Sequence, residues 1–288
     1  MSTFKSFALV GANGHIGKHV LKAFQAIGIN PLILSRKSSN SADSLPSSLP
    51  VAKVDLDNVD EVAQALEQHG IEVVVSAIAS TALGGTQQYL ADASKKAGVK
   101  LFVPSEFGMP TEGISRAPGA NPQSPVTQKD QFAAEYLKSI GLPWARFFTG
   151  LFAGFAPWIG AVEENGKFNI EKGKGSTELT TITHEDDIGG FVAHVLTTLP
   201  PKELEYRAFR IAGENISLEA VGKRLNKEIE YVDVIPGSGL LAEIRKVLLS
   251  LGYAGRALTS WDPATNSRRQ GPQANDNHLW AGHEWKNL

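Results

Sequence analysis

Residues 7–20 read FALVGANGHIGKHV, and the rest of the architecture can be argued from this stretch. Four apolar residues of strand character run directly into three glycines, Gly11, Gly14 and Gly17, and a segment of helical period follows. Gly11 permits a tight turn, Gly14 lets a phosphate approach the backbone, and Gly17 lets the helix lie close to the strand. The order strand, glycine turn, helix therefore predicts a dinucleotide site, the alternative being an ordinary tight turn.

Short apolar runs alternate with helical segments along the first half of the chain. The runs with strand character are residues 7–10, 32–34, 51–54, 73–78, 101–103 and 144–148. This alternation is typical of βαβ units, so we expect an α/β fold with a Rossmann-type, doubly wound parallel sheet of six strands. The residues expected on the buried face of the first helix are Ile16, Val20, Phe24 and Ile27.

The pattern becomes less regular beyond Gly150. We therefore expect two domains, a dinucleotide-binding Rossmann domain over residues 1–150 and a smaller C-terminal α/β substrate lobe over residues 151–288. Residues 262–279 are polar and rich in turn formers, which favours a loop or mobile tail over packed structure.

Capping residues predict where several helices begin. Asn58, with Glu61 three residues later, is typical of a helix start. Thr183 and Ser217 are expected to open two helices of the second lobe, and residues 240–251 a third.

Composition excludes several classes of function. The chain of 288 residues has no cysteine, so disulfides, thiolate metal sites and cysteine nucleophiles are excluded, and His278 and His283 lack metal-ligand spacing. We expect no metal. The net charge of -2, without clustered basic residues, argues against nucleic acid as a partner. With no signal-peptide pattern and no unbroken apolar span, we expect a cytoplasmic protein without a membrane partner; monomer and homodimer both stay open.

The end of the second strand bears on cofactor choice. An NAD site presents an acidic residue there, whereas this chain has Ser35, Arg36 and Lys37. Arg36 can form a two-pronged pair with a 2′-phosphate and Lys37 adds a point charge. We therefore expect NADP(H), the alternative being a solvated basic turn.

Further cofactor contacts are expected at the glycine turn and at the carboxyl ends of later strands, where ligands of open α/β sheets bind. These residues are Asn13, His15, Ile16, Asp55, Leu56, Ser76, Ala77 and Ile78. Gln87, on the next helix, is a weaker candidate whose alternative is an exposed helix residue.

Three more segments complete a family resemblance: LFVPSEFGMP at 101–110, VTQK at 126–129 and GLPWARFFTGLFAGF at 141–155. Together with the glycine turn they resemble the NmrA-like, isoflavone reductase-like branch of atypical short-chain dehydrogenases. The resemblance implies that the PSEFG loop contacts the nicotinamide end of NADPH, through Pro104, Ser105, Glu106 and Phe107. It also implies that Lys129 is the catalytic lysine and contacts the cofactor.

The chemistry expected of Lys129 follows from what the chain lacks. No Tyr is followed four residues later by Lys, so the YxxxK pair of ordinary short-chain dehydrogenases is absent. Lys129 is therefore the candidate for proton transfer or substrate polarisation, because partial burial beside the positive charge of the oxidised ring lowers a lysine pKa. The alternative is an exposed lysine at a helix start.

Aromatic residues after Gly150 favour a flat apolar substrate. The substrate candidates are Phe107, Phe152, Phe155, Trp158 and His184, their alternatives being core side chains and a structural histidine. The expected function is an NADPH-dependent reductase that transfers hydride to a small aromatic substrate. The alternative is a non-catalytic, NADP(H)-sensing regulatory protein of NmrA type.

Overall fold

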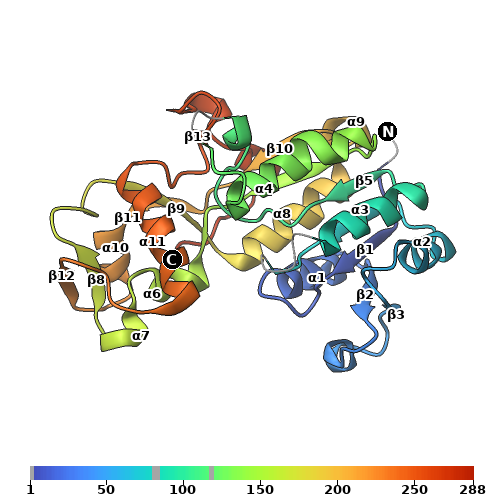
Figure 1. Ribbon diagram of the computed structural model, residues 1–288, viewed down its shortest axis with the longest axis horizontal. Coiled ribbons are helices and arrows are strands. Elements are labelled where there is room, and N and C mark those ends of the chain that lie inside the picture. Colours follow the sequence, from blue (N-terminus) through green and yellow to red (C-terminus); the bar gives the residue numbers. More distant parts are fainter. Residues whose placement is uncertain (1–2, 80–84, 117–119) are drawn as a thin grey trace. The chain divides into compact units, whose positions relative to one another are not determined.

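The computed structural model describes residues 3–79, 85–116 and 120–288 (Figure 1). The chain forms two compact units that share the sequence in alternation. Unit 1 comprises residues 1–107, 111–147 and 188–209, and unit 2 comprises residues 108–110, 148–187 and 210–288. Because residues 188–209 pack with the first unit, the chain crosses between units several times, whereas we expected a single boundary near residue 150.

The sheet of unit 1 confirms the α/β prediction but has fewer strands than expected. Its parallel strands are β1 (Phe7–Val10), β2 (Leu32–Arg36), β3 (Val51–Val54), β4 (Val73–Ser76) and β5 (Leu101–Val103), in the order β3-β2-β1-β4-β5. The sixth predicted strand, β6 (Ala145–Phe148), instead pairs with β10 (Arg207–Arg210). A single parallel bridge between Phe102 and Trp144 connects it to β5, which has only three residues to offer as a partner.

Helices cover both faces of this sheet. On one face α2 (Val59–Gln68) and α3 (Thr86–Lys96) bury a core with alternate residues of the strands, such as Ala8 and Val10. On the other face lies α1 (Gly17–Ala26), whose Phe24 ring is 4.8 Å from that of Phe7. Ile27 is 52% exposed, contrary to expectation, because α1 ends one residue before it.

The remaining helices of unit 1 include the one that carries Lys129. They are α4 (Pro125–Gln131), the π-helical turn η4 (Phe132–Tyr136), α5 (Leu137–Ser139), α8 (Glu185–Thr198, which begins in unit 2) and α9 (Pro201–Leu204). The cap at Asn58 is confirmed, since its side chain accepts hydrogen bonds from the N–H groups of Asp60 and Glu61. Among the described helices, none combines the length and apolar character needed to cross a membrane.

Unit 2 is built from small sheets and helices, the longest of which is α11. Its strands are β7 (Leu151–Phe152), β8 (Phe168–Glu171), β9 (Leu179–Thr183), β11 (Glu214–Ser217), β12 (Ile229–Val232), β13 (Trp261–Asp262) and β14 (Ser267–Arg268). Its longer helices are α6 (Ala156–Ile159), α7 (Val162–Asn165), α10 (Leu218–Arg224) and α11 (Gly239–Tyr253). Ser217 caps α10 as predicted, by accepting from the Ala220 N–H. Thr183 does not cap α8, because its hydroxyl accepts from the Gly213 N–H and His184 caps the helix instead.

The C-terminal segment, residues 262–279, is mostly loop, which was one of the two predicted alternatives, but near its end it is hydrogen-bonded to the rest of unit 2. The Asp276 N–H donates to the Arg210 carbonyl, and the Asp276 carboxylate accepts from the Arg210 N–H. The Asn277 side chain pairs with both backbone groups of Ala212. The polar composition that suggested mobility supplies these bonds: Asp and Asn side chains satisfy backbone groups at the end of β10.

Candidate active site

The glycine turn has no room for side chains. Gly11 has φ +82°, and a Cβ built on it would lie 2.5 Å from the carbonyl oxygen of Ala77. A Cβ on Gly17 would lie 2.0 Å from the carbonyl oxygen of Gly11. These approaches are below van der Waals contact, so the turn exists only because both positions are glycine. The start of α1 and the end of β4 are thereby brought together.

A groove of about 470 Å³ runs over the carboxyl ends of the strands of unit 1. Eight of the predicted cofactor residues line it: Gly11, Asn13, Gly14, Ser35, Arg36, Leu56, Ala77 and Ile78. A neighbouring pocket of about 410 Å³ adds Lys37 and Asp55. Lining residues that the motif did not indicate are Ala12, Ser39, Ala42, Leu45 and Thr86. The glycine cradle, the apolar walls and the exposed guanidinium of Arg36 fit a dinucleotide that carries an additional phosphate.

Of the residues predicted at the glycine turn and at the ends of the first four strands, four lie outside both pockets. Ser76 is fully buried, and its hydroxyl has no hydrogen-bond partner within the described residues. Ile16 and Gly17 are buried at the start of α1, where they shape the turn rather than face the groove. His15 is exposed, with its ring 6.5 Å from that of His19. Ser76 is the last residue of β4, and Ala77 and Ile78, which follow the end of the strand, line the groove.

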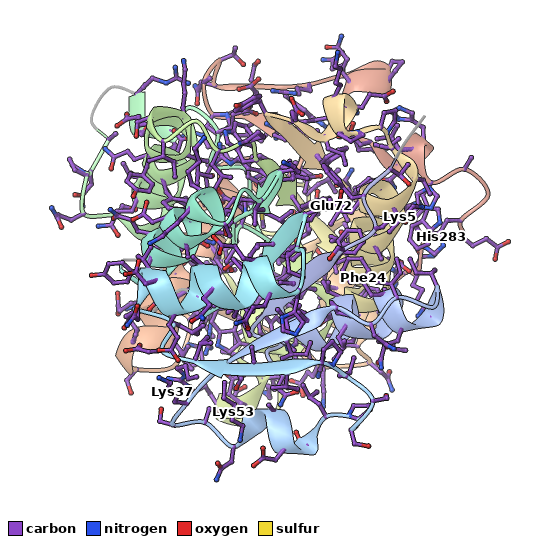
Figure 2. All side chains as sticks on the ribbon, turned by 90° about the vertical axis from the view of Figure 1, so that its right-hand side faces the viewer. Lys5, Phe24, Lys37, Lys53, Glu72 and His283 are labelled. Atoms are coloured by element: carbon purple, nitrogen blue, oxygen red, sulfur yellow. The ribbon has the colours of Figure 1, made fainter. Side chains whose placement is uncertain are left out.

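The two basic residues at the end of β2 differ in their surroundings. Lys37 is ion-paired with Glu61 of α2, with 2.6 Å between the amine and a carboxylate oxygen. Lys37 and Lys53 both lie at the surface of the molecule (Figure 2). Arg36 is exposed and lines both pockets. The guanidinium is therefore better placed than the amine to pair with a phosphate.

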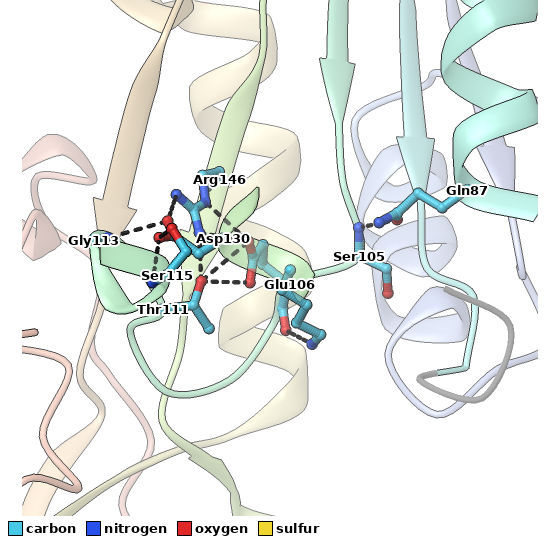
Figure 3. Close-up of polar contacts among 9 residues, drawn as sticks. Gln87, Ser105, Glu106, Thr111, Gly113, Ser115, Asp130 and Arg146 are labelled. Carbon is cyan, nitrogen blue, oxygen red and sulfur yellow. Dashed lines mark hydrogen bonds and ion pairs between the residues drawn. The ribbon is translucent and has the colours of Figure 1, made fainter. Parts of the chain in front are cut away.

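The PSEFG loop is tied to the groove by Ser105. Its N–H donates to the Gln87 side-chain oxygen at 2.8 Å (Figure 3). Its hydroxyl donates to the carbonyl of Ile78 at 2.8 Å. Gln87 is thus 2% exposed, which excludes the exposed alternative, and it positions the loop. Phe107 has φ +27°, a conformation that L residues rarely adopt, and its ring stacks on Phe147.

Lys129 lies on α4 and reaches the same loop. Its Nζ donates to the backbone carbonyl of Glu106 at 3.0 Å. Burial lowers the pKa of Lys129, the Glu106 carboxylate acts to raise that pKa, and the Arg146 guanidinium lowers it further. The helix changes from α to π geometry three residues later, at Phe132, a distortion frequent at functional sites. Lys129 is therefore a half-buried amine whose proton is easier to remove than that of an exposed lysine.

A buried group of charges that the sequence did not indicate lies behind Lys129. Arg146, on β6, pairs with Glu106 at 2.8 Å and with Asp130 at 3.3 Å, and these three side chains are at most 2% exposed (Figure 3). Arg146 also donates to the Thr111 hydroxyl, which donates to the Glu106 carboxylate. The Glu106 side chain is engaged in this cluster, and its backbone carbonyl is the part that meets Lys129. The one feature of the sequence that could have indicated this cluster is the position of Arg146 within the otherwise apolar strand β6.

The substrate candidates of unit 2 form an aromatic row. The ring of Phe155 lies 5.6 Å from that of Phe152 and 6.1 Å from that of Trp158. Phe155 is 38% exposed, so this row is not simply core. His184 accepts a hydrogen bond at Nδ1 from the Asp186 N–H, so one ring nitrogen has the structural role that we gave as the alternative.

Known proteins with similar sequences or structures include several named as reductases. The chain is 36% identical over 148 residues to an oxidoreductase of Aspergillus flavus, an alignment that spans 50% of this chain and about half, 48%, of that protein. It is 26% identical over 245 residues to a phenylcoumaran benzylic ether reductase of Pinus taeda, covering 80% of this chain and 77% of the relative. The complex of leucoanthocyanidin reductase with NADPH from Vitis vinifera has a similar fold, with a TM-score of 0.76, 18% identity and coverage of 98% and 96%.

The family model with the description NmrA-like family matches residues 3–256, which is most of the chain. This match includes the glycine turn, the PSEFG loop and Lys129. The chain belongs to the NmrA-like family.

Proposed function

We propose that this protein is an NADPH-dependent reductase that acts on a small aromatic substrate. The observation that carries the proposal is a continuous connection within unit 1 from groove to amine. Ile78 lines the groove, Ser105 bonds to the Ile78 carbonyl, and the next residue along, Glu106, holds Lys129. A dinucleotide groove and a lysine of lowered pKa are thereby connected by hydrogen bonds through two consecutive residues of one loop.

The groove residues have separate binding roles. Arg36 would hold the 2′-phosphate, and the N–H groups at the start of α1 would face the pyrophosphate. Ala77 and Ile78 supply backbone along the dinucleotide. When bound, NADPH supplies the hydride. Known relatives named as reductases support this assignment.

Lys129 contributes the proton. Its Nζ has three donors, of which one is directed at the Glu106 carbonyl, so the others are available to an oxygen of the substrate. Because burial favours the neutral amine, transfer of a proton from Nζ is easier than from an exposed lysine. The Glu106 carbonyl orients the amine during this step.

The substrate class is inferred from the aromatic row and from the names of relatives. Phe152, Phe155 and Trp158 offer flat apolar surfaces of the kind that stack on an aromatic ring. A relative named phenylcoumaran benzylic ether reductase supports an aromatic acceptor.

The test measures oxidation of NADPH in the presence of a panel of phenylpropanoid and quinone compounds. The loss of NADPH absorbance reports the reaction. We expect at least one compound to be reduced by the parent chain and not by Lys129→Met, although both bind NADPH in calorimetry. Binding of NADPH without turnover of any compound would contradict the reductase and favour the regulatory alternative. The absence of any calorimetric signal would contradict the cofactor assignment itself.

A further inference from the structure

The buried charges behind Lys129 have a geometry that bears on the proposed reaction. Arg146 contacts two carboxylates, Glu106 on the PSEFG loop and Asp130 on α4. Glu106 is the residue whose carbonyl accepts from Lys129, and Asp130 is the residue next to Lys129 in sequence. One guanidinium therefore bridges the loop and the helix between which the amine is held.

Each carboxylate is held by further donors. Glu106 accepts from the Thr111 hydroxyl at 3.1 Å. Asp130 accepts from the Gly113 N–H at 3.1 Å and from the Ser115 N–H and hydroxyl at 3.0 and 2.6 Å. Buried ions with satisfied hydrogen bonds have little freedom to move, so the cluster is a rigid support (Figure 3).

The charges of this region balance only when Lys129 is counted. Arg146 alone faces two carboxylates, and a protonated Lys129 brings the count to two positive and two negative groups. A buried set with unequal charge is unfavourable, so the state of the amine and the state of the cluster depend on each other. Lys129 also lines a separate surface pocket, and Glu135 and Tyr136 line that pocket further along the chain. Tyr136 donates to Asp92.

We infer that Arg146 is a positioning residue for the proposed reductase, because it joins the loop and the helix that hold the Lys129 amine. This inference rests on the proposed function, because a positioning residue serves the reaction only if Lys129 takes part in it. The physical effect that the inference predicts, however, concerns the Lys129 amine alone. Replacement of Arg146 by Lys keeps a positive charge but loses the planar fork that reaches both carboxylates. The loop and α4 then separate, and water reaches the amine.

The test measures Lys129 without any substrate. Lysine labelled with ¹³C at the ε carbon is followed by NMR as pH rises, and the Lys129 signal is identified as the one absent in Lys129→Met. Because burial is the main cause that lowers the pKa of Lys129, we expect Arg146→Lys to raise that pKa toward its ordinary value. We expect Glu106→Gln to shift the pKa in the opposite direction, since the carboxylate acts to raise it.

A matched control separates positioning from general loss of stability. Arg210 of unit 2 is also fully buried and donates to the carbonyls of Thr259 and Trp261. Arg210→Lys is expected to lower the melting temperature comparably and to leave the Lys129 titration unchanged. If Arg146→Lys fails to fold, Thr111→Val removes a single hydroxyl from the cluster and is expected to cause a smaller rise of the same sign.

The outcomes are distinct from those that test the reductase. An unchanged Lys129 titration in folded Arg146→Lys, with a melting temperature lowered as in Arg210→Lys, would overturn the inference whatever compound is reduced. A shifted titration in a protein that reduces no compound would uphold the positioning of Lys129 and contradict the reductase. With an active substrate, we expect Arg146→Lys to lower kcat by about tenfold or more while the Kd for NADPH changes little.

Discussion

The groove over the strand ends and the charge cluster behind Lys129 belong to the same unit but are assembled differently. The groove is built around a turn of seven consecutive residues, from Gly11 to Gly17. The cluster joins Glu106, Asp130 and Arg146, which are separated by tens of positions. The glycine turn of the groove is therefore a local motif, whereas the cluster exists only once the chain has folded.

This difference has a physical origin. A glycine turn is specified by backbone conformation, which neighbouring residues determine. A buried ion cluster is specified by which side chains meet in the interior. The sequence around each member, taken alone, does not indicate that the residue belongs to a cluster. The two regions should accordingly respond in different ways to substitution.

The largest effect is expected at the point where the two regions meet. Lys129→Met removes the amine that we propose transfers the proton while keeping the apolar stem, so we expect turnover to fall by about 10²- to 10⁴-fold. Steady-state kinetics and calorimetry measure this, and the Kd for NADPH should stay nearly constant. Equal turnover in Lys129→Met and the parent would exclude Lys129 from the chemistry.

The next effect concerns the glycine turn. Gly11→Ala places a Cβ 2.5 Å from the Ala77 carbonyl in a left-handed conformation, so we expect a loss of about 2–4 kcal/mol in the free energy of unfolding and weaker NADPH binding. Gly28→Ala is the control, because Gly28 has φ +77° but nothing within 4 Å of its Cβ position. For Gly28→Ala we expect a loss of about 1 kcal/mol in the free energy of unfolding, because only the left-handed backbone conformation is unfavourable there. Chemical denaturation measures both losses. Equal losses at both positions would argue against the close approach.

A smaller effect distinguishes the two basic residues. Arg36→Glu should weaken NADPH binding by about 10- to 100-fold, since a charge-assisted hydrogen bond contributes about 1.5–3 kcal/mol. Lys37→Ala should have less effect, because that amine is paired with Glu61. Calorimetry with NADPH and NADH measures both, and NADH affinity should change little. A stronger effect from Lys37 than from Arg36 would reverse the assignment.

The smallest expected effect is a displacement of a pH profile. Burial lowers the pKa of Lys129, and the protonated amine is the form that donates, so turnover should fall as pH rises through this lowered pKa. The unfolded chain keeps its lysine protonated up to the ordinary pKa, so the free energy of unfolding should increase with pH over the interval between the two values. The pH dependence of kcat/KM and of urea unfolding measures these effects. A profile that declines only at the ordinary lysine pKa would contradict the lowered value.

The sequence predicted the parts of the fold that depend on short-range patterns. Strand runs, the glycine turn and the caps at Asn58 and Ser217 were confirmed because each is determined by neighbours along the chain. The number of strands in the sheet was not predicted correctly, because the pairing of β6 with β10 depends on residues far along the chain. The hydrogen bonds from Asp276 and Asn277 in the C-terminal loop were missed for the same reason, because their partners are residues 210–212.

For the candidate site, the sequence by itself determined the glycine cradle, the basic end of β2 and the family motif that contains Lys129. The tertiary structure alone decided that Lys37 is paired with Glu61, that Gln87 is buried against Ser105 and that Arg146 bridges two carboxylates. The physical reason is the range of the forces involved. Backbone conformation is a local property of the chain, whereas ion pairing in the interior depends on which distant residues the fold brings together.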